Sequence, residues 1–405
     1  MKSILASVLF LHLAATLGAV AADSTATAPK TLTAPPAVTA AVKAPDTAVV
    51  NLSLVRDTRS ALSRGHDFLL SQQGGNGSWK QDPAITGLVV YAFVLDPLYN
   101  PNIKSEMALA RAITYLEDFV KPDGGIYRKD YAHYTTAVCL LAFSETKQAK
   151  YRDIIKNARQ YLIVSQVDES ENYKPDHPYY GGIGYGGDER PDLSNTHLAM
   201  EAIRAADRYE ARFTGAVPEA TGDTTIKQAA PELHWEKALI FLNRCQNVKA
   251  VNTMDYATDD GGFIYETGTY KAERSHSYGS MTYAGVKSLI YANVKKDDIR
   301  VQKAAAWIRD HYTWKENPGF GTTSLFYYFM TGAKSLSVLG DDFVVTPDGI
   351  AHNWREEIIR QILSLQGEDG SWLNSNGQYW ENIKDLSTAY NLIALKYTLQ
   401  GLSGE

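Results

Sequence analysis

The feature that most constrains how this chain can fold is a helical unit that recurs six times along it. Each unit opens with a helix that ends in a pair of large apolar residues: Phe68-Leu69, Tyr115-Leu116, Tyr161-Leu162, Phe241-Leu242, Trp307-Ile308 and Ile362-Leu363. A glutamine often follows about one turn later, at Gln73, Gln166, Gln246 and Gln366. Such self-similarity is typical of repeat architectures, in which each unit buries its apolar face against its neighbours.

A glycine-rich turn and a second helix complete each unit. The turns read GGNGSW, PDGGIY, YGGIGYGG, DDGGFIY, NPGFG and EDGSW. The second helix carries a threonine near its start, which gives a column of Thr86, Thr136, Thr196, Thr282, Thr323 and Thr388. Five of the six residues that stand six positions later are Ala or Ser, so we expect the second helices to approach closely there. The fifth unit fits worst, since Thr322 or Ser324 would serve the column as well as Thr323.

The stretch from Tyr180 to Ala206 contains the unit in its fullest form. Its glycine-rich turn runs into Pro191-Asp192, where a helix is predicted to begin. Asp192 is the predicted N-cap, because its carboxylate can accept the exposed amide proton of Asn195. One face of the helix is apolar, with Leu193, Thr196, Met200 and Ile203 at helical spacing.

Six helical hairpins with almost no strand pattern predict an all-α domain. We expect an (α/α)6 toroid, in which a ring of inner helices is surrounded by a ring of outer helices. Closing the ring buries the apolar faces of all six hairpins and leaves no raw ends. An open bundle of stacked hairpins is the structural alternative.

The N-terminal 50 residues differ in character from the repeats. Met1-Lys2 precedes an apolar run and a set of small residues around Ala21, which predicts a secretory signal peptide over residues 1–22. Residues 23–50 are mostly Ala, Thr, Pro and Val, so we expect a disordered linker before a toroid domain over residues 51–405. No later apolar run is long enough to span a membrane. We therefore expect an exported protein, periplasmic or extracellular.

Charge and cysteine content narrow the classes of partner. The chain has 46 acidic and 40 basic residues, which gives no electrostatic reason to expect a nucleic-acid partner. Its two cysteines, Cys139 and Cys245, lie in different units. Export would permit a disulfide between them, but we expect buried free thiols. No clustered Cys/His motif, phosphate loop or Ser-His-Asp set stands in the sequence, so we expect no metal and no cofactor.

Over nearly all of residues 54–402 the sequence resembles the terpenoid-cyclase and protein-prenyltransferase superfamily. Gln73-GGNGS-Trp79 and Gln366-GEDGS-Trp372 look like the Gln-Trp repeats of squalene cyclases, with the same spacing. In that family the glutamine amide holds the turn and the tryptophan stacks over it. The segment GGIGYGGDERPDLSNTHLAMEAIRAA resembles the same unit in exported bacterial proteins with prenyltransferase and squalene-oxidase repeats.

The chain departs from this family at the positions that carry its chemistry. Class II cyclases have Asp-x-Asp-Asp-Thr, with a proton-donating Asp two residues before the Thr; this chain has Ala84, Tyr134, Ser194, Ser280, Gly321 and Leu386 there. Protein prenyltransferases bind zinc through Asp-x-Cys, whereas Asp82 and Asp192 lack the Cys two residues later. We therefore expect neither alkene protonation of the usual kind nor zinc-dependent prenyl transfer.

Polar residues around the starts of the second helices are the candidates for ligand contact, because these ends would face the central cavity of a toroid. They are His133, Tyr185, Asp192, Asn195, His197, Arg274, His276, Tyr278, Tyr283 and Asp385. In the fourth unit, Arg274, His276 and Tyr283 would suit an anionic or polar ligand. The structural alternative is that the Asp residues cap helices and the His residues are hydrogen-bonded packing elements.

Three functions are open at this point. The first, implied by the family resemblance, is the binding of an apolar isoprenoid-like ligand in the central cavity, with or without its transformation. The second is a non-catalytic binding or scaffold protein at the cell envelope, and the third is a glycan-active lyase or hydrolase. A cavity lined mainly by carbon would favour a lipid ligand, and converging carboxylates and histidines would favour polar chemistry.

Overall fold

The structure is a computed structural model that describes residues 51–95, 103–187, 190–215, 233–268 and 276–403. All of these residues belong to one compact unit, Val42–Glu405. The predicted signal peptide and linker (1–50) lie outside the described residues, and so does the candidate Arg274.

Twelve α-helices alternate between two sets in the described residues. The outer helices are α1 (Leu52–Gln72), α3 (Ile103–Glu117), α5 (Arg152–Val164), α7 (Trp235–Cys245), α9 (Ile299–Asp310) and α11 (Trp354–Ser364). The inner helices are α2 (Pro83–Val94), α4 (Ala132–Glu145), α6 (Leu193–Thr214), α8 (Gly279–Tyr291), α10 (Leu325–Leu339) and α12 (Lys384–Ser403). An antiparallel hairpin of β1 (Phe343–Val345) and β2 (Ala351–Asn353), in which Val344 pairs with His352, precedes α11.

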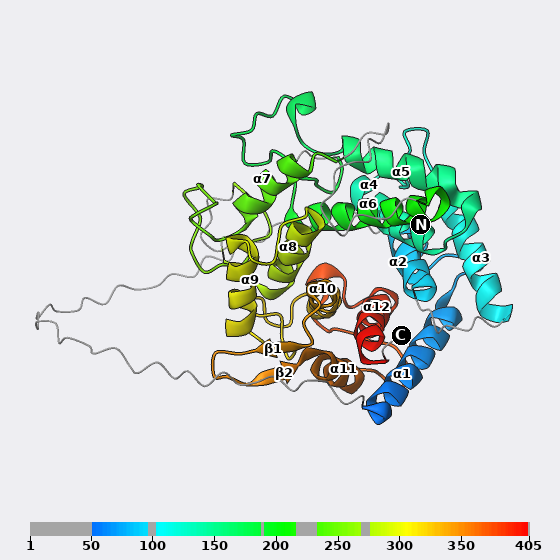
Figure 1. Ribbon diagram of the computed structural model, residues 1–405. Helices are drawn as coiled ribbons and strands as arrows, with labels where there is room; N and C mark the ends of the chain where they lie inside the picture. Colours follow the sequence, from blue (N-terminus) through cyan, green and yellow to red (C-terminus); the bar gives the residue numbers. More distant parts are fainter. Residues whose placement is uncertain (1–50, 96–102, 188–189, 216–232, 269–275, 404–405) are drawn as a thin grey trace, which may run out of the picture. The chain divides into compact units, whose positions relative to one another are not determined.

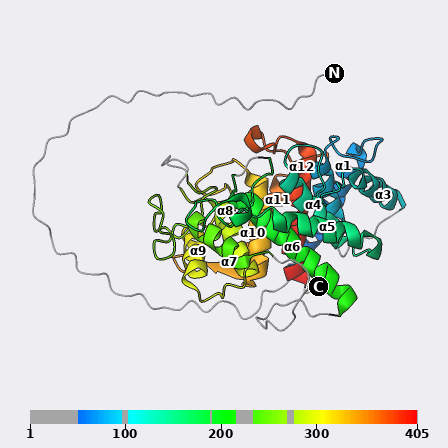
Figure 2. The ribbon, with the colours of Figure 1, turned by 90° about the horizontal axis from the view of Figure 1, so that it is seen from above.

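The inner helices form a closed ring. Each inner helix contacts the next one, and α12 contacts α2, so the last unit joins the first. Figure 1 shows the outer helices around this ring, and each contacts an inner helix of its own or a neighbouring unit. The longest of the twelve helices, α6, has 22 residues and lies across the view in Figure 2. The predicted (α/α)6 toroid is therefore confirmed, and the open bundle is not formed.

In four of the six units, a glutamine at the end of the outer helix ties the glycine turn to the next outer helix. Nε2 of Gln73 donates to the carbonyl oxygens of Gly77 and Ala108, both at 2.8 Å. Nε2 of Gln166 and Gln246 makes the same pair of bonds, to Gly181 and His234 and to Gly261 and Arg300. In the last unit the Gln366 amide reaches Gly370 and Ala61 of α1, both at 2.9 Å, and so closes the outer ring. The role that the family resemblance implied for glutamine is confirmed.

The turn glycines are required because each turn lies directly on the backbone of the next outer helix. Gly370 has φ +82°, and a Cβ there would lie 2.5 Å from the Arg64 carbonyl oxygen of α1. Gly77 and Gly261 would meet Arg111 and Lys303 at the same distance, also with positive φ. Only glycine adopts this conformation without strain and leaves room for the approach.

The threonine column has a structural role in five units. The hydroxyl oxygens of Thr86, Thr136, Thr196, Thr282 and Thr388 accept the backbone N–H of an apolar residue in the preceding turn, at 2.9 to 3.2 Å. These bonds fix the start of each inner helix against its own turn. The assignment of Thr323 to the column is wrong, because Thr323 and Ser324 precede α10. Tyr328 stands at the equivalent position and donates its hydroxyl to the Thr313 carbonyl.

The remaining packing predictions can be compared directly with the structure. Trp79 and Trp372 are fully buried, and each indole N–H donates to a carbonyl of its own outer helix. Cys139 and Cys245 are buried free thiols, as expected. Among the described residues, no helix has both the length and the apolarity needed to cross a bilayer.

Replacing Gln366 by Ala should lower the free energy of unfolding by about 1–3 kcal/mol, because the change leaves two carbonyl oxygens without their donor at the closure of the ring. Urea unfolding monitored by circular dichroism measures this. Gln72→Ala is the control. Gln72 is exposed at the end of the outer helix α1, so its replacement should change stability by less than about 0.5 kcal/mol. Equal effects of the two changes would contradict the role assigned to Gln366.

Candidate functional site

The inner helices all begin at one end of the ring, because each follows an antiparallel outer helix through a glycine turn. We call this the N-terminal end of the ring and the opposite side its C-terminal end. Four side chains, Tyr134, Ser194, Tyr327 and Tyr390, come from the starts of four inner helices, and we call them the tyrosine layer. The hydroxyls of Tyr134 and Tyr390 lie 3.5 Å apart, and Ser194 Oγ lies 3.0 Å from the Tyr327 hydroxyl. Since α4 and α12 are not adjacent, and neither are α6 and α10, these contacts span the centre of the ring.

Further tyrosines surround this layer. The ring of Tyr185 lies 6.1 Å from that of Tyr134, and its hydroxyl is hydrogen-bonded to Tyr265. Tyr278, at the start of α8, stacks on Phe320 at 4.6 Å. Tyr134, Tyr278 and Tyr327 are only half-buried although protein surrounds them on all sides. Part of each of these side chains is therefore accessible at this end of the ring.

Asp192 lies beside the tyrosine layer and is the N-cap of α6. Its Oδ1 accepts the backbone N–H of Asn195 at 2.8 Å, as predicted, and its Oδ2 accepts Nδ2 of the same residue at 2.6 Å. Burial disfavours the charged carboxylate by more than these hydrogen bonds favour it, and raises the pKa of Asp192 to about 7. Asp192 can therefore hold or release a proton near neutral pH.

A second set of side chains lies deeper along the axis. Glu201 of α6, Lys287 of α8 and Lys334 of α10 are all buried, and we call them the charged layer. Lys287 Nζ lies 2.7 Å from Glu201 Oε2, and Lys334 Nζ lies 3.0 Å from Oε1. Lys334 also lies over the rings of Tyr91 and Tyr397, 4.9 and 5.6 Å from their centroids. The charged layer thus connects five of the six inner helices.

Burial and neighbouring charges together determine the protonation states of Lys287, Glu201 and His197 in this layer. Burial lowers the pKa of Lys287 to about 7, against the attraction of Glu201. Burial raises the pKa of the Glu201 carboxyl, but the two ammonium groups lower it by more, so that it stays ionised. His197 Nε2 lies 4.0 Å from Glu201 Oε2, and burial keeps its pKa well below the usual value. Neither ring nitrogen of His197 has a hydrogen-bond partner among the described residues.

The structure brings together about half of the predicted site residues. Tyr185, Asp192, Asn195 and Tyr278 gather at the N-terminal end of the ring, and His197 joins the charged layer. Asp385 is buried in the first turn of α12 and pairs with Lys80 of the first unit at 3.1 Å.

Three predicted residues lie elsewhere, held by packing or open to solvent. His133 bonds the Gly184 carbonyl at 3.1 Å and packs on Tyr161 of the outer helix α5. Tyr283 stacks on Trp314 at 5.9 Å. His276 is exposed.

Sequence reasoning missed the charged layer and most of the tyrosine layer. A signal for the charged layer was present, because Lys287 and Lys334 are the only charged residues of α8 and α10, and Glu201 is the only acidic or basic residue besides His197 in the first half of α6. Buried Lys and Glu are rare unless they are paired, so such residues on separate buried helices predict an ion pair. Tyr327 and Tyr390 carried no comparable signal, because tyrosine is abundant throughout the chain, with 25 residues.

The described residues around the tyrosine layer offer hydroxyl groups and one weakly acidic carboxyl. Within the described ranges, no three His, Cys, Asp or Glu side chains are grouped so that they could hold a metal ion. Ser194 stands two residues before Thr196 and bonds Tyr327, so a hydroxyl occupies that position. The raised pKa of Asp192 makes it a weak acid, suited to proton exchange with polar groups.

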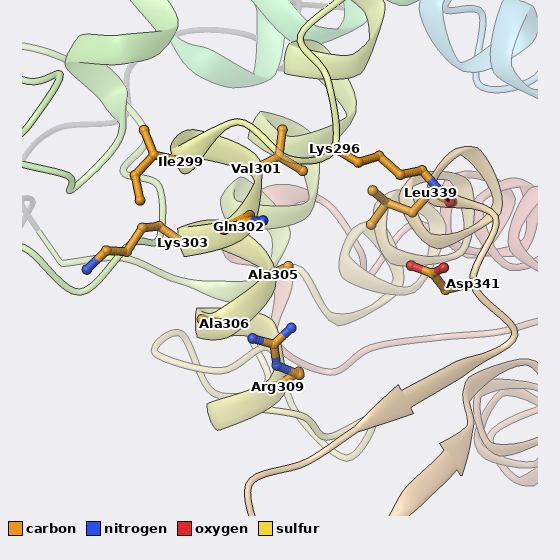
Figure 3. Close-up of a pocket in the computed structure, with 10 residues that line it drawn as sticks. All are labelled: Lys296, Ile299, Val301, Gln302, Lys303, Ala305, Ala306, Arg309, Leu339 and Asp341. Atoms are coloured by element: carbon orange, nitrogen blue, oxygen red, sulfur yellow. Dashed lines mark hydrogen bonds between the residues drawn. The ribbon is translucent and has the colours of Figure 1, made fainter. Parts of the chain in front are cut away.

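A separate depression lies beside the outer helix α9, away from both layers (Figure 3). It is lined by Lys296, Ile299, Val301, Gln302, Lys303, Ala305, Ala306, Arg309, Leu339 and Asp341. Lys296 donates to the Leu339 carbonyl at one side of it. None of the predicted site residues contributes to this depression.

Comparison with known proteins identifies the fold. No family model matches the chain, and no curated protein matches it. A variant of the type II terpene cyclase MstE from Scytonema, in complex with the product merosterolic acid A, aligns with a TM-score of 0.50 and 13% identity, over 86% of this chain and 99% of that chain. An apo variant of the same cyclase gives 0.50 and 13% over 87% and 99%. The terpenoid-cyclase-like fold predicted from the Gln-Trp units is confirmed, and identity at this level shows the fold alone.

Replacing Asp192 by Asn should change how stability depends on pH. A carboxyl whose folded pKa is raised stabilises the protein fully below its ordinary value of 3.8, and this stabilisation is lost as the pH rises to about 7. Asn still caps the helix but does not ionise. The free energy of unfolding of Asp192→Asn, relative to the natural chain, should therefore rise by up to about 1.4 kcal/mol per pH unit between about pH 4 and 7.

Urea unfolding of both proteins across that range is the measurement. Asp298→Asn, at the N-cap of α9, is the control, because hydrogen bonding from Arg300 lowers the pKa of Asp298. Its carboxyl is then largely ionised in both states above about pH 5, and the difference should be nearly flat from there to pH 7. A flat difference for Asp192→Asn as well would show that its carboxyl is not perturbed.

Proposed function

We propose that this protein binds an apolar, isoprenoid-like ligand at the N-terminal end of its ring, against the tyrosine layer. The observation that supports this proposal most directly is that Tyr134, Tyr327 and Tyr390 converge on the axis from three inner helices. Tyr134 and Tyr327 are only half-buried there. Tyrosine rings offer large apolar faces at low entropic cost, while their hydroxyls are paired with one another and with Ser194. The terpene-cyclase fold supports the proposal, because a relative with that fold holds a terpenoid product.

The ligand would not be activated by protonation of an alkene. That step needs a strong acid, which class II cyclases supply from two residues before the threonine, and Ala84, Tyr134, Ser194, Ser280 and Leu386 stand there in this chain, none of them an acid. The nearest carboxyl, Asp192, has its pKa raised to about 7, which weakens it as an acid. We therefore propose a binding role, with any chemistry confined to proton exchange at Asp192.

The binding would take place outside the cytoplasm. This part of the proposal is supported by the sequence of residues 1–22, which has the charged start, apolar run and small residues of a signal peptide. Mass spectrometry of the protein from the periplasm or medium should find a new N-terminus near Asp23. Recovery of intact Met1 only from the cytoplasm would contradict export.

A polar ligand, such as a glycan, is the second candidate. It is favoured by the tyrosine hydroxyls and by Asp192, whose pKa near neutrality would suit acid–base exchange. Polysaccharides screened for new reducing ends would reveal such an activity. If it occurred, it should be lost in Asp192→Asn.

Geranylgeraniol should bind the mature protein, and Tyr327→Ala should weaken that binding at least about tenfold, equivalent to about 1.4 kcal/mol. Trp380, which is half-exposed and lies 5.9 Å from Tyr131 near the same end of the ring, provides a fluorescence signal. Trp380→Phe identifies the part of the signal that comes from this residue.

Tyr127→Ala is the matched control for binding. Tyr127 is half-buried like Tyr327, but it belongs to a glycine turn and packs on Tyr161 of α5. The control should bind geranylgeraniol as the natural chain does. No binding by the natural protein, or equal losses in the two variants, would contradict the proposed ligand or its position.

A further inference from the structure

The charged layer has more positive than negative charge around it. Lys287 and Lys334 share the single carboxylate of Glu201. Arg208, two turns further along α6, adds a third cation, and Glu145 of α4 adds a second carboxylate near it. Arg208 is exposed, so the buried part of this cluster has two amines against one carboxylate, and one positive charge is in excess among these described groups when both lysines are protonated.

Such an excess is unfavourable inside a protein, because a buried charge loses its hydration and needs a compensating partner. Lys287 shows the effect, since burial lowers its pKa to about 7 even with Glu201 at 2.7 Å. The unpartnered ring nitrogens of buried His197 lie next to the same groups. The layer therefore contains polar atoms that the described protein groups leave unsatisfied.

At the C-terminal end of the ring, partly exposed side chains lie near this layer. Tyr397 is half-buried and Arg208 is exposed, whereas Lys334 beneath them is buried. The Tyr91 and Tyr397 hydroxyls lie 3.2 Å apart, and both tyrosines are close enough to Arg208 to interact with it electrostatically. A guanidinium and two hydroxyls thus lie around the outer side of two buried ammonium groups.

We propose that Arg208, Tyr91 and Tyr397, with Lys334 and Lys287 beneath them, form a binding site for an oxyanion at the C-terminal end of the ring. The ligand chemistry is a phosphate or carboxylate group, either free or as the head group of a larger molecule. Arginine binds planar oxyanions through two parallel hydrogen bonds, and tyrosine hydroxyls donate to the remaining oxygens. This site is distinct from the tyrosine layer and does not depend on the isoprenoid-like ligand proposed for it.

Isothermal titration with inorganic phosphate, at constant ionic strength set with sodium chloride, tests the site on the mature protein. We expect saturable binding to the natural chain and at least tenfold weaker binding to Arg208→Gln. Arg212→Gln is the matched control, because Arg212 is also exposed and lies one turn further along α6. It should bind phosphate as the natural chain does.

A second variant tests the buried part of the site. Glu201→Gln removes the carboxylate that competes for the two lysines, so phosphate should bind more tightly to it than to the natural chain. If Glu201→Gln does not fold, the comparison of Arg208→Gln with Arg212→Gln still decides the matter. Equal phosphate affinity in those two variants would overturn the proposal.

Dodecyl phosphate in a parallel titration distinguishes a free anion from a head group. Binding of either compound that is lost in Arg208→Gln supports the site, and preference for dodecyl phosphate identifies a head group. Binding of neither would overturn it. Tyr327→Ala should leave inorganic phosphate affinity unchanged, so a failure at this site is distinguishable from a failure to bind geranylgeraniol at the tyrosine layer.

Discussion

The closed ring depends on one repeated interaction, the glutamine amide that bonds its own glycine turn and the next outer helix at once. Gln73, Gln166, Gln246 and Gln366 each make this pair of bonds, and the last of them links α11 to α1. The turn glycine must have no side chain, because its Cα lies against the backbone of that same helix. One local rule therefore sets both the step from unit to unit and the closure of the ring.

Closure of the ring constrains the side chains on its axis, and the inner helices satisfy this constraint in two different ways. Six helices around one axis bring side chains from non-adjacent units into contact, and these side chains must pack or pair with one another. Near the helix starts, the side chains on the axis pair through hydroxyls and aromatic rings. Deeper in the ring, Glu201 pairs with Lys287 and Lys334. The two layers therefore differ in chemistry.

The fold of type II terpene cyclases is thus combined with an axis that is not simply apolar. From the sequence, we expected a cavity lined mainly by carbon to favour a lipid ligand, and converging carboxylates and histidines to favour polar chemistry. The structure has tyrosines at one end and a buried charge cluster further in, so both features occur at different depths. No acid stands two residues before any of the column threonines, where Ala84, Tyr134, Ser194, Ser280 and Leu386 are found, and a fold positions residues but does not supply their chemistry.

The sequence by itself determined the helices, the glycine turns, the recurring glutamines, five of the six positions of the threonine column and the ring. These features are set by hydrogen bonds within a unit or between consecutive units, and they leave a repeating pattern in the chain. The predicted cap at Asp192 was found for the same reason, since its partner Asn195 is three residues away. Only the tertiary structure decided which side chains meet on the axis. Tyr134 and Tyr390 are 256 residues apart, and Glu201 meets two lysines from two later units. No local sequence pattern predicts such contacts, because they form only when closure brings non-adjacent helices together. Nor did the sequence predict Tyr328, which takes the place of threonine in the fifth unit and donates its hydroxyl to the Thr313 carbonyl.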